Sequence, residues 1–94
     1  MDKEQLFELG SVVATTGLRR RLGDTADVEI LKALRKHQAG DWGDVGSSTK
    51  KQNAQALREG ERILSAYVSA YGIKFWVITE WDRSVTTALL PEEY

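Results

Sequence analysis

The spacing of the apolar residues changes at Arg62, and this change constrains the fold more than any other feature of the sequence. Before Arg62, the apolar residues recur at intervals that fit one face of a helix. After Arg62, they alternate with polar residues, as on a β-strand with one buried face. Helices followed by a set of strands indicate an α+β domain, in which N-terminal helices pack on a C-terminal sheet.

Three β-prone runs begin at Arg62. They cover residues 62–71, 73–79 and 85–90, and they are separated by Gly72 and by a polar turn over residues 81–84. Short connections between successive strands favour antiparallel pairing. We therefore expect a three-stranded antiparallel β-meander.

Two helices are predicted before the strands. Residues 28–37 carry an apolar face and end in basic residues, which the helix dipole favours there, and Asp24, Thr25 and Asp27 each suit the N-cap. The glycine-rich loop over residues 40–46 cannot continue this helix, and we expect Trp42 to fold back from it onto the core. Residues 49–59 form a second, surface helix, which Ser47 or Ser48 caps and Gly60 ends.

The N-terminal segment carries weaker signals. Residues 3–8 are predicted to form a short helical turn that Gly10 stops. Residues 12–15 suit either a short strand or the entry to a helical turn over residues 18–22, which Gly23 would close.

Size and composition favour a single soluble domain over residues 1–94. The sequence has no cysteine, which excludes a disulfide framework and a thiolate metal site. The N-terminus is charged and has no apolar signal core, and no apolar run reaches the ~20 residues of a membrane span, so we expect a cytoplasmic protein without a membrane partner. The net charge of −1 gives no support for a general nucleic-acid binder, and the basic run at residues 19–21 is the main feature in favour of one.

Four residues are candidates for catalysis. His37 is the sole histidine and suits proton transfer, although a helix-terminal imidazolium or packing on Trp42 explains it as well. Arg62 and Arg83 lie at strand edges with Glu80 and Asp82 close by, and Arg62 can clamp a phosphate. The alternative for Arg62 is a cross-strand ion pair with Glu80.

The binding candidates are aromatic and polar residues of the loop and the sheet. They are Trp42, Trp76, Trp81, Asp82, Arg83 and Thr86. The polar segment over residues 79–87 is either a site or a well-bonded hairpin turn. The strand over residues 73–79 carries large apolar residues on both faces, so the face without helices is expected to contact a partner or a second copy of the chain.

Asp41 and Asp44 flank Trp42 in the glycine-rich loop, and two carboxylates can hold a hard cation such as Mg²⁺. Nothing near them in the sequence supplies further ligands, so capping and turn bonding is the preferred interpretation. No phosphate-binding loop or nucleophile elbow is present. We expect neither a metal nor a cofactor.

The blocks at residues 37–44, 62–67 and 74–94 together resemble a family of short bacterial proteins that plasmids and other mobile elements carry. These proteins are labelled "plasmid-related protein" or "type I restriction endonuclease subunit M", and the resemblance runs from about Leu9 to Tyr94. A methyltransferase subunit needs a glycine-rich cofactor loop and an Asn/Asp-Pro-Pro-aromatic motif, and this chain has one proline and neither motif. The resemblance therefore implies a mobile-element protein and no particular activity.

A second resemblance concerns mechanism. Arg62-Ile63-Leu64, Trp76-Val77-Ile78-Thr79 and Thr86-Thr87 are similar to the C-terminal strands of barnase-like ribonucleases. That similarity would give Arg62 the phosphate-binding role. The chain departs from the pattern in the final turn, where Trp81-Asp82-Arg83 stands in place of the acid histidine, so His37 would have to substitute.

Three functions follow from these observations. The preferred one is a non-catalytic binding or regulatory protein of a mobile element, which acts on a partner protein or a small ligand, with a homodimer as one form of association. The second is a ribonuclease-type toxin that uses His37, Arg62, Glu80 and Arg83. The third is a DNA-binding regulator that uses the basic run at residues 19–21.

Overall fold

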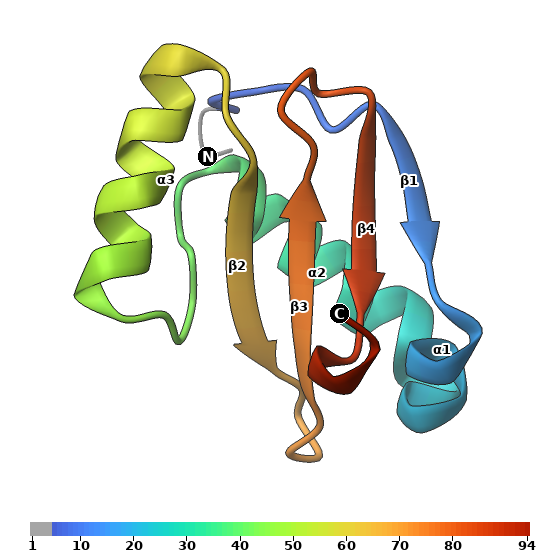
Figure 1. Ribbon diagram of the computed structural model, residues 1–94. Helices are drawn as coiled ribbons and strands as arrows, with labels where there is room; N and C mark the ends of the chain where they lie inside the picture. The colour runs from blue at the N-terminus through green and yellow to red at the C-terminus, as the bar shows by residue number, and fades with distance from the viewer. Residues whose placement is uncertain (1–4) are drawn as a thin grey trace.

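The computed structural model describes residues 5–94, which fold into an α+β arrangement of helices on a four-stranded sheet (Figure 1). The elements in chain order are β1 (Ser11–Ala14), α1 (Thr16–Leu22), α2 (Ala26–Gln38), α3 (Ser47–Glu59), β2 (Ile63–Val68), β3 (Lys74–Thr79) and β4 (Val85–Leu89). Two 3₁₀ turns, η1 (Gly23–Thr25) and η2 (Pro91–Glu93), precede α2 and follow β4. The predicted α+β class is confirmed.

The sheet has one strand more than the predicted three-stranded meander. β2, β3 and β4 pair antiparallel in succession, as expected, with Ile78 opposite both Leu64 and Thr87. β1 adds in parallel to the other edge of β4, with Val12 opposite Thr86, so the sheet is mixed and its order is β1-β4-β3-β2. Residues 12–15 were one candidate for a short strand, and β1 and α1 now account for both alternatives. The three-stranded prediction is wrong because no local signal shows that this strand joins the sheet beside β4.

α2 lies behind the strands in Figure 1 and α1 lies beyond the end of β1, and the core lies between these helices and the strands. The core consists of Leu18, Leu22, Ala26, Ile30, Ala33, Leu34, Tyr67, Phe75, Val77, Ala88 and Leu90. The predicted helix over residues 28–37 is confirmed within α2. Thr25 holds its N-cap position, but the Thr25 hydroxyl donates to the Leu22 carbonyl and caps no N–H group.

α3 lies beside β2 (Figure 1) and confirms the second predicted helix. It begins at Ser47 with Gly46 as N-cap, so the prediction that Ser47 or Ser48 caps it is wrong. The helix ends as expected, because Gly60 adopts a left-handed conformation with φ of 71° and its N–H donates to the Ala56 carbonyl.

The edge of β2 that does not face β3 is covered along most of its length. The Asn53 side chain of α3 donates to the Leu64 carbonyl at 2.8 Å and accepts the Leu64 N–H at 3.1 Å. Two residues further along β2, the Ala66 N–H donates to the Trp42 carbonyl and the Ala66 carbonyl accepts the Asp44 N–H. These bonds occupy backbone groups that would otherwise recruit another strand.

The predicted helical turn over residues 3–8 falls partly outside the described residues, and residues 5–8 are not helical. The Leu6 N–H instead donates to the Gln38 carbonyl at 2.8 Å, and the Gln38 side chain donates to the Phe7 carbonyl at 2.9 Å. The last turn of α2 therefore holds this segment, which passes over the end of the helix. Between residues 5 and 94, no helix is both long and apolar enough to cross a lipid bilayer.

Candidate functional site

His37 lies on the buried face of α2 and is fully enclosed. Its Nδ1 lies 2.5 Å from Ser65 Oγ on β2, and its Nε2 lies 2.9 Å from Thr79 Oγ1 on β3. Thr79 Oγ1 lies 2.7 Å from Thr86 Oγ1 on β4, which donates to the Leu9 carbonyl at 2.7 Å. This buried chain of hydrogen bonds ties α2 to three strands and to the segment before β1.

The Leu9 carbonyl fixes the position of every proton in this chain. Thr86 commits its single hydroxyl proton to that carbonyl, so Thr86 Oγ1 must accept from the Thr79 hydroxyl. Thr79 Oγ1 in turn accepts from His37, so Nε2 carries the imidazole proton. Nδ1 is then the acceptor for the Ser65 hydroxyl.

The imidazole of His37 is neutral at pH 7. Burial, with a smaller contribution from the positive charge of Arg83, lowers the pKa of His37 to about 3. A general acid or base works best with a pKa near the operating pH and needs to reach its substrate. His37 meets neither condition, because its ring is enclosed and both nitrogens are bonded within the protein.

Aromatic rings enclose the imidazole at the end of α2. Phe7 and Trp42 lie edge-on to His37 at centroid distances of 5.2 and 5.9 Å, and they stack on each other at 6.4 Å. The expected packing of His37 on Trp42 is therefore confirmed. The alternative, an imidazolium stabilised by the helix dipole, is wrong, because burial against these rings disfavours the charged form.

Arg83 holds the end of α3 against the turn between β3 and β4. Its backbone is left-handed, with φ of 60°. Its guanidinium donates to the carbonyls of Glu61 at 2.6 Å, Ala56 at 3.0 Å, Glu80 at 3.1 Å and Trp81 at 3.2 Å. The Ala56 carbonyl lies in the last turn of α3 and also accepts the Gly60 and Glu61 N–H groups, so Arg83 adds a side-chain bond to a main-chain cap. Arg83 thus uses its forked donors within the protein.

Arg62 and Glu80 do not form the expected ion pair. The ion pairs within residues 5–94 are Arg19–Asp27 and Arg21–Glu92. The guanidinium carbon of Arg62 instead lies 5.4 Å from the centre of the Tyr94 ring, in a cation–π arrangement. The four catalytic candidates therefore do not converge on one open site.

The polar segment over residues 79–87 is a bonded hairpin turn. Asp82 Oδ1 accepts the Ser84 hydroxyl at 2.6 Å and the Ser84 N–H at 3.1 Å, and these bonds lower the pKa of Asp82. Trp81 projects from the turn with 65% of its surface exposed. Thr86 is fully buried beneath α2, so it is not available to a ligand.

Asp41 and Asp44 form hydrogen bonds that hold the loop along β2. Asp41 accepts the Gly43 N–H at 3.3 Å, and the Asp44 N–H donates to the Ala66 carbonyl at 2.7 Å. No cluster of three or more His, Asp or Glu side chains that could hold a metal ion occurs in the part of the chain that the structure describes.

The sheet face opposite α1 and α2 carries a cluster in which Arg62, Val68 and Tyr94 are exposed and Trp76 is half-buried, and we call these four residues the outer-face patch. Trp76 packs edge-on against Tyr94 at 5.6 Å, and Arg62 lies over the same tyrosine. Val68 and Trp76 also line a hollow of about 100 Å³ beside Pro91. On the helix-covered face, Phe75 and Val77 are buried, as expected.

Part of the expected outer face is not exposed. Ile78 shares this face with Trp76, but it is buried. The exposed surface therefore lies toward the beginning of β3 and the end of the chain. Sequence reasoning missed Tyr94 as a site residue, because only the return of the chain after β4 brings it to Trp76, and no local pattern announces that contact.

Comparison with known proteins identifies no relative. No protein-family model matches the chain, and neither a curated protein nor a solved structure is significantly similar to it. The functional argument therefore rests on the geometry of the molecule and on its sequence.

Proposed function

We propose that this chain is a small accessory protein of a bacterial mobile element that acts in the cytoplasm by binding another protein. The mobile-element context is supported by the resemblance of residues 37–44, 62–67 and 74–94 to the plasmid-related family. The mode of action is supported by the outer-face patch. A second copy of the chain is one form that this partner can take.

The observation that carries the proposal is the packing of Trp76, Tyr94 and Arg62 on the sheet face away from α1 and α2. Trp, Tyr and Arg are the residue types that dominate the binding energy of protein interfaces. Tyr94 is 59% exposed, and the hollow beside Trp76 offers room for a partner side chain. Exposed aromatic surface next to a hollow gains free energy when a partner removes it from water.

The hydrogen bonding of the catalytic candidates favours binding over catalysis. His37 is neutral and hydrogen-bonded at both nitrogens, and the Arg83 guanidinium donates to four backbone carbonyls. A ribonuclease of the barnase type needs an accessible acid, and His37, which would have to supply it, is enclosed. In this structure His37 and Arg83 stabilise the fold instead.

The charges on α1 favour a protein partner over DNA. Arg19 is paired with Asp27 at 3.0 Å, and Arg21 approaches Glu92 at 3.4 Å. These carboxylates reduce the positive potential that a phosphate backbone would meet. The basic run at residues 19–21 therefore attracts DNA less strongly than its sequence suggests.

The test is recovery of the protein from its bacterial host with its partners, followed by native mass spectrometry. Trp76→Ala is the test variant, and Trp81→Ala is the matched control, because Trp81 is an exposed tryptophan beyond the other end of β3. We expect Trp76→Ala to lose the associated chain while Trp81→Ala retains it. Equal recovery in both variants would overturn the proposal.

A further inference from the structure

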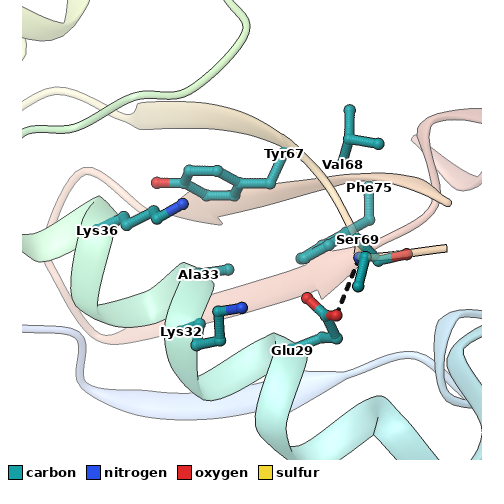
Figure 2. Close-up of a pocket in the computed structure, with 9 residues that line it drawn as sticks. Glu29, Lys32, Ala33, Lys36, Tyr67, Val68, Ser69 and Phe75 are labelled. Carbon is teal, nitrogen blue, oxygen red and sulfur yellow. Dashed lines mark hydrogen bonds between the residues drawn. The ribbon is translucent and has the colours of Figure 1, made fainter. Parts of the chain in front are cut away.

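The two edges of the sheet differ in what covers their backbone groups. The edge of β2 is bonded to α3 and to the loop before it, at Leu64 and Ala66. Just beyond β2, the Glu29 carboxylate on α2 accepts the Ala70 N–H at 3.0 Å, a bond drawn as a dashed line in Figure 2. β1 forms the opposite edge of the sheet (Figure 1), and within residues 5–94 no hydrogen bond covers its outer side.

The register of β1 shows which of its backbone groups are free. The N–H groups of Ser11 and Thr15 each donate at 3.0 Å to carbonyls on or next to β4. Alternate residues of a strand bond to the same neighbour, so the N–H and C=O groups of Val12 and Ala14 point away from the sheet. The strand is held at both ends, and its outer edge therefore needs little ordering before another strand pairs with it.

β1 also lacks the residues that protect an open edge in many proteins. Its sequence, Ser11–Ala14, contains neither a charged residue nor a proline. Val12 lies opposite Thr86 on the face toward α2, and Val13 lies on the outer face; they are 47% and 48% exposed. Apolar side chains on both faces thus flank free hydrogen-bonding groups, which is the arrangement that accepts a further strand.

We propose that β1 pairs with β1 of a second copy of this chain, antiparallel about a two-fold axis at Val13. In this register Val12 of each copy pairs with Ala14 of the other, so both outward N–H groups and both outward C=O groups of each strand find partners. The two Val13 side chains meet on the outer face, where an aliphatic cross-strand pair is favourable. The result is one sheet of eight strands, four from each copy.

The charges beside β1 favour a second copy over a strand of another protein. Glu8 stands five residues before Val13 and α1 begins three residues after it, so an antiparallel copy places its α1 beside Glu8. The two ion pairs among residues 5–94 use the arginines on either side of Arg20, which is exposed and takes part in neither. The two-fold axis therefore brings the exposed Glu8 of each copy toward Arg20 of the other.

The dimer should be weak and independent of the outer-face patch. Stable complexes bury about 1,200–2,000 Å² of surface, and a strand of four residues with its flanks buries less. We therefore expect a Kd of roughly 0.1–1 mM. Such a dimer is dissociated at the low micromolar concentrations of native mass spectrometry, so association through Trp76, two strands away on β3, is measured separately.

The experiment is sedimentation equilibrium of the purified protein at concentrations up to about 2 mM, twice the weakest expected Kd. Val12→Pro is the test variant, because it removes an outward N–H that the fold does not use. Val12→Ala is the matched control, because it shortens the side chain and keeps the N–H. The mean mass of the wild type and of Val12→Ala should rise from 10.5 kDa toward twice that value, and Val12→Pro should stay at 10.5 kDa. Trp76→Ala should behave as the wild type.

A charge exchange tests the register without changing β1. Glu8→Arg and Arg20→Glu should each weaken the dimer about fivefold at low salt, since two contacts per dimer change from attraction to repulsion. The double variant restores opposite charges and should return the Kd to within about twofold of the wild type. This pair of variants decides the question even where proline disturbs the strand.

Three results would overturn the proposal. A monomer at every concentration would leave a strand of another protein as the occupant of this edge. A dimer that persists in a folded Val12→Pro but is lost in Trp76→Ala would assign self-association to the outer-face patch. A double charge variant that dimerises no better than the single variants would show that Glu8 and Arg20 do not meet across a two-fold axis.

Discussion

The Nε2–H of His37 donates to Thr79 Oγ1 across 2.9 Å, at the centre of a buried polar chain that spans the layer between α2 and the sheet. Every member of that chain finds a partner, and the described residues contain no buried side-chain nitrogen or oxygen atom without one. Fully satisfied buried networks favour one arrangement of helix and strands over its alternatives. His37 therefore sets the position of α2 on the sheet.

Stability should fall as the pH is lowered from 8 to 5. The pKa of His37 is about 3 in the folded protein and near 6.5 in the unfolded chain, so the unfolded chain takes up the proton first. The contribution is fully present above pH 6.5 and is lost as the pH falls toward 3. Urea unfolding should show a loss of about 2 kcal/mol between pH 8 and pH 5.

His37→Gln is the control for this pH dependence. The variant has no group that titrates between pH 5 and 8 at this position, so its unfolding free energy should change much less over that range. A pH dependence of the unfolding free energy as steep as that of the wild type would assign the effect to another group.

The ¹⁵N shifts of the His37 ring should show the Nε2-protonated tautomer at pH 7. The Nδ1-protonated form would contradict the proton positions derived from the Leu9 carbonyl.

Replacement of Arg83 by lysine should destabilise the fold. A lysine keeps the charge but cannot direct a planar fork at carbonyls as far apart in sequence as Ala56 and Trp81. We expect Arg83→Lys to lower the free energy of unfolding by about 2 kcal/mol, since hydrogen bonds from charged groups contribute ~1.5–3 kcal/mol each and some are kept. Urea unfolding measures this, and wild-type stability in Arg83→Lys would refute the role of the fork.

The backbone of Arg83 permits a second comparison. At φ of 60°, alanine is strained by about 1 kcal/mol whereas glycine is not. Arg83→Gly should therefore be more stable than Arg83→Ala by about that amount, although both lose the guanidinium. The opposite order would show that the left-handed conformation is not kept in solution.

Asn53 should be needed to protect the edge of β2. Asn53→Ala removes both bonds to Leu64 and leaves a partly buried N–H and C=O unpaired, which costs about 2–3 kcal/mol of unfolding free energy. It also opens part of a strand edge to other chains. Urea unfolding and light scattering at increasing concentration measure the two effects. Gln52→Ala, on the exposed side of the same helix, is the control and should change neither.

Part of this structure was predictable from sequence periodicity. His37 follows Ala33 and Leu34 by one helical turn, so the apolar face of α2 places it toward the core. Its partners Ser65, Thr79 and Thr86 were not predictable, because they meet only after three strands take their places in the sheet. The same holds for β1, whose partner strand lies near the other end of the chain.

The interpretation of charged residues from sequence was less successful. Arg83, next to Glu80 and Asp82, was a candidate for catalysis and binding, yet its guanidinium reaches across to the end of α3. The carbonyls of Ala56 and Glu61 come near Arg83 only after the chain folds, so no local pattern in the sequence indicates these bonds. Arg62 likewise pairs with the ring of Tyr94 and not with the nearby carboxylate.

The most direct test of the proposed binding function is native mass spectrometry, together with light scattering, on protein purified from its own host as wild type, Trp76→Ala and Trp81→Ala. Loss of an interface hot spot costs at least ~2 kcal/mol, or roughly 30-fold in affinity. We predict that the wild type and Trp81→Ala carry a second chain, either another protein or a second copy of 10.5 kDa, and that Trp76→Ala is recovered alone. Recovery of all three as bare monomers, or of all three with the same partner, would contradict the assignment of the outer-face patch as the binding surface.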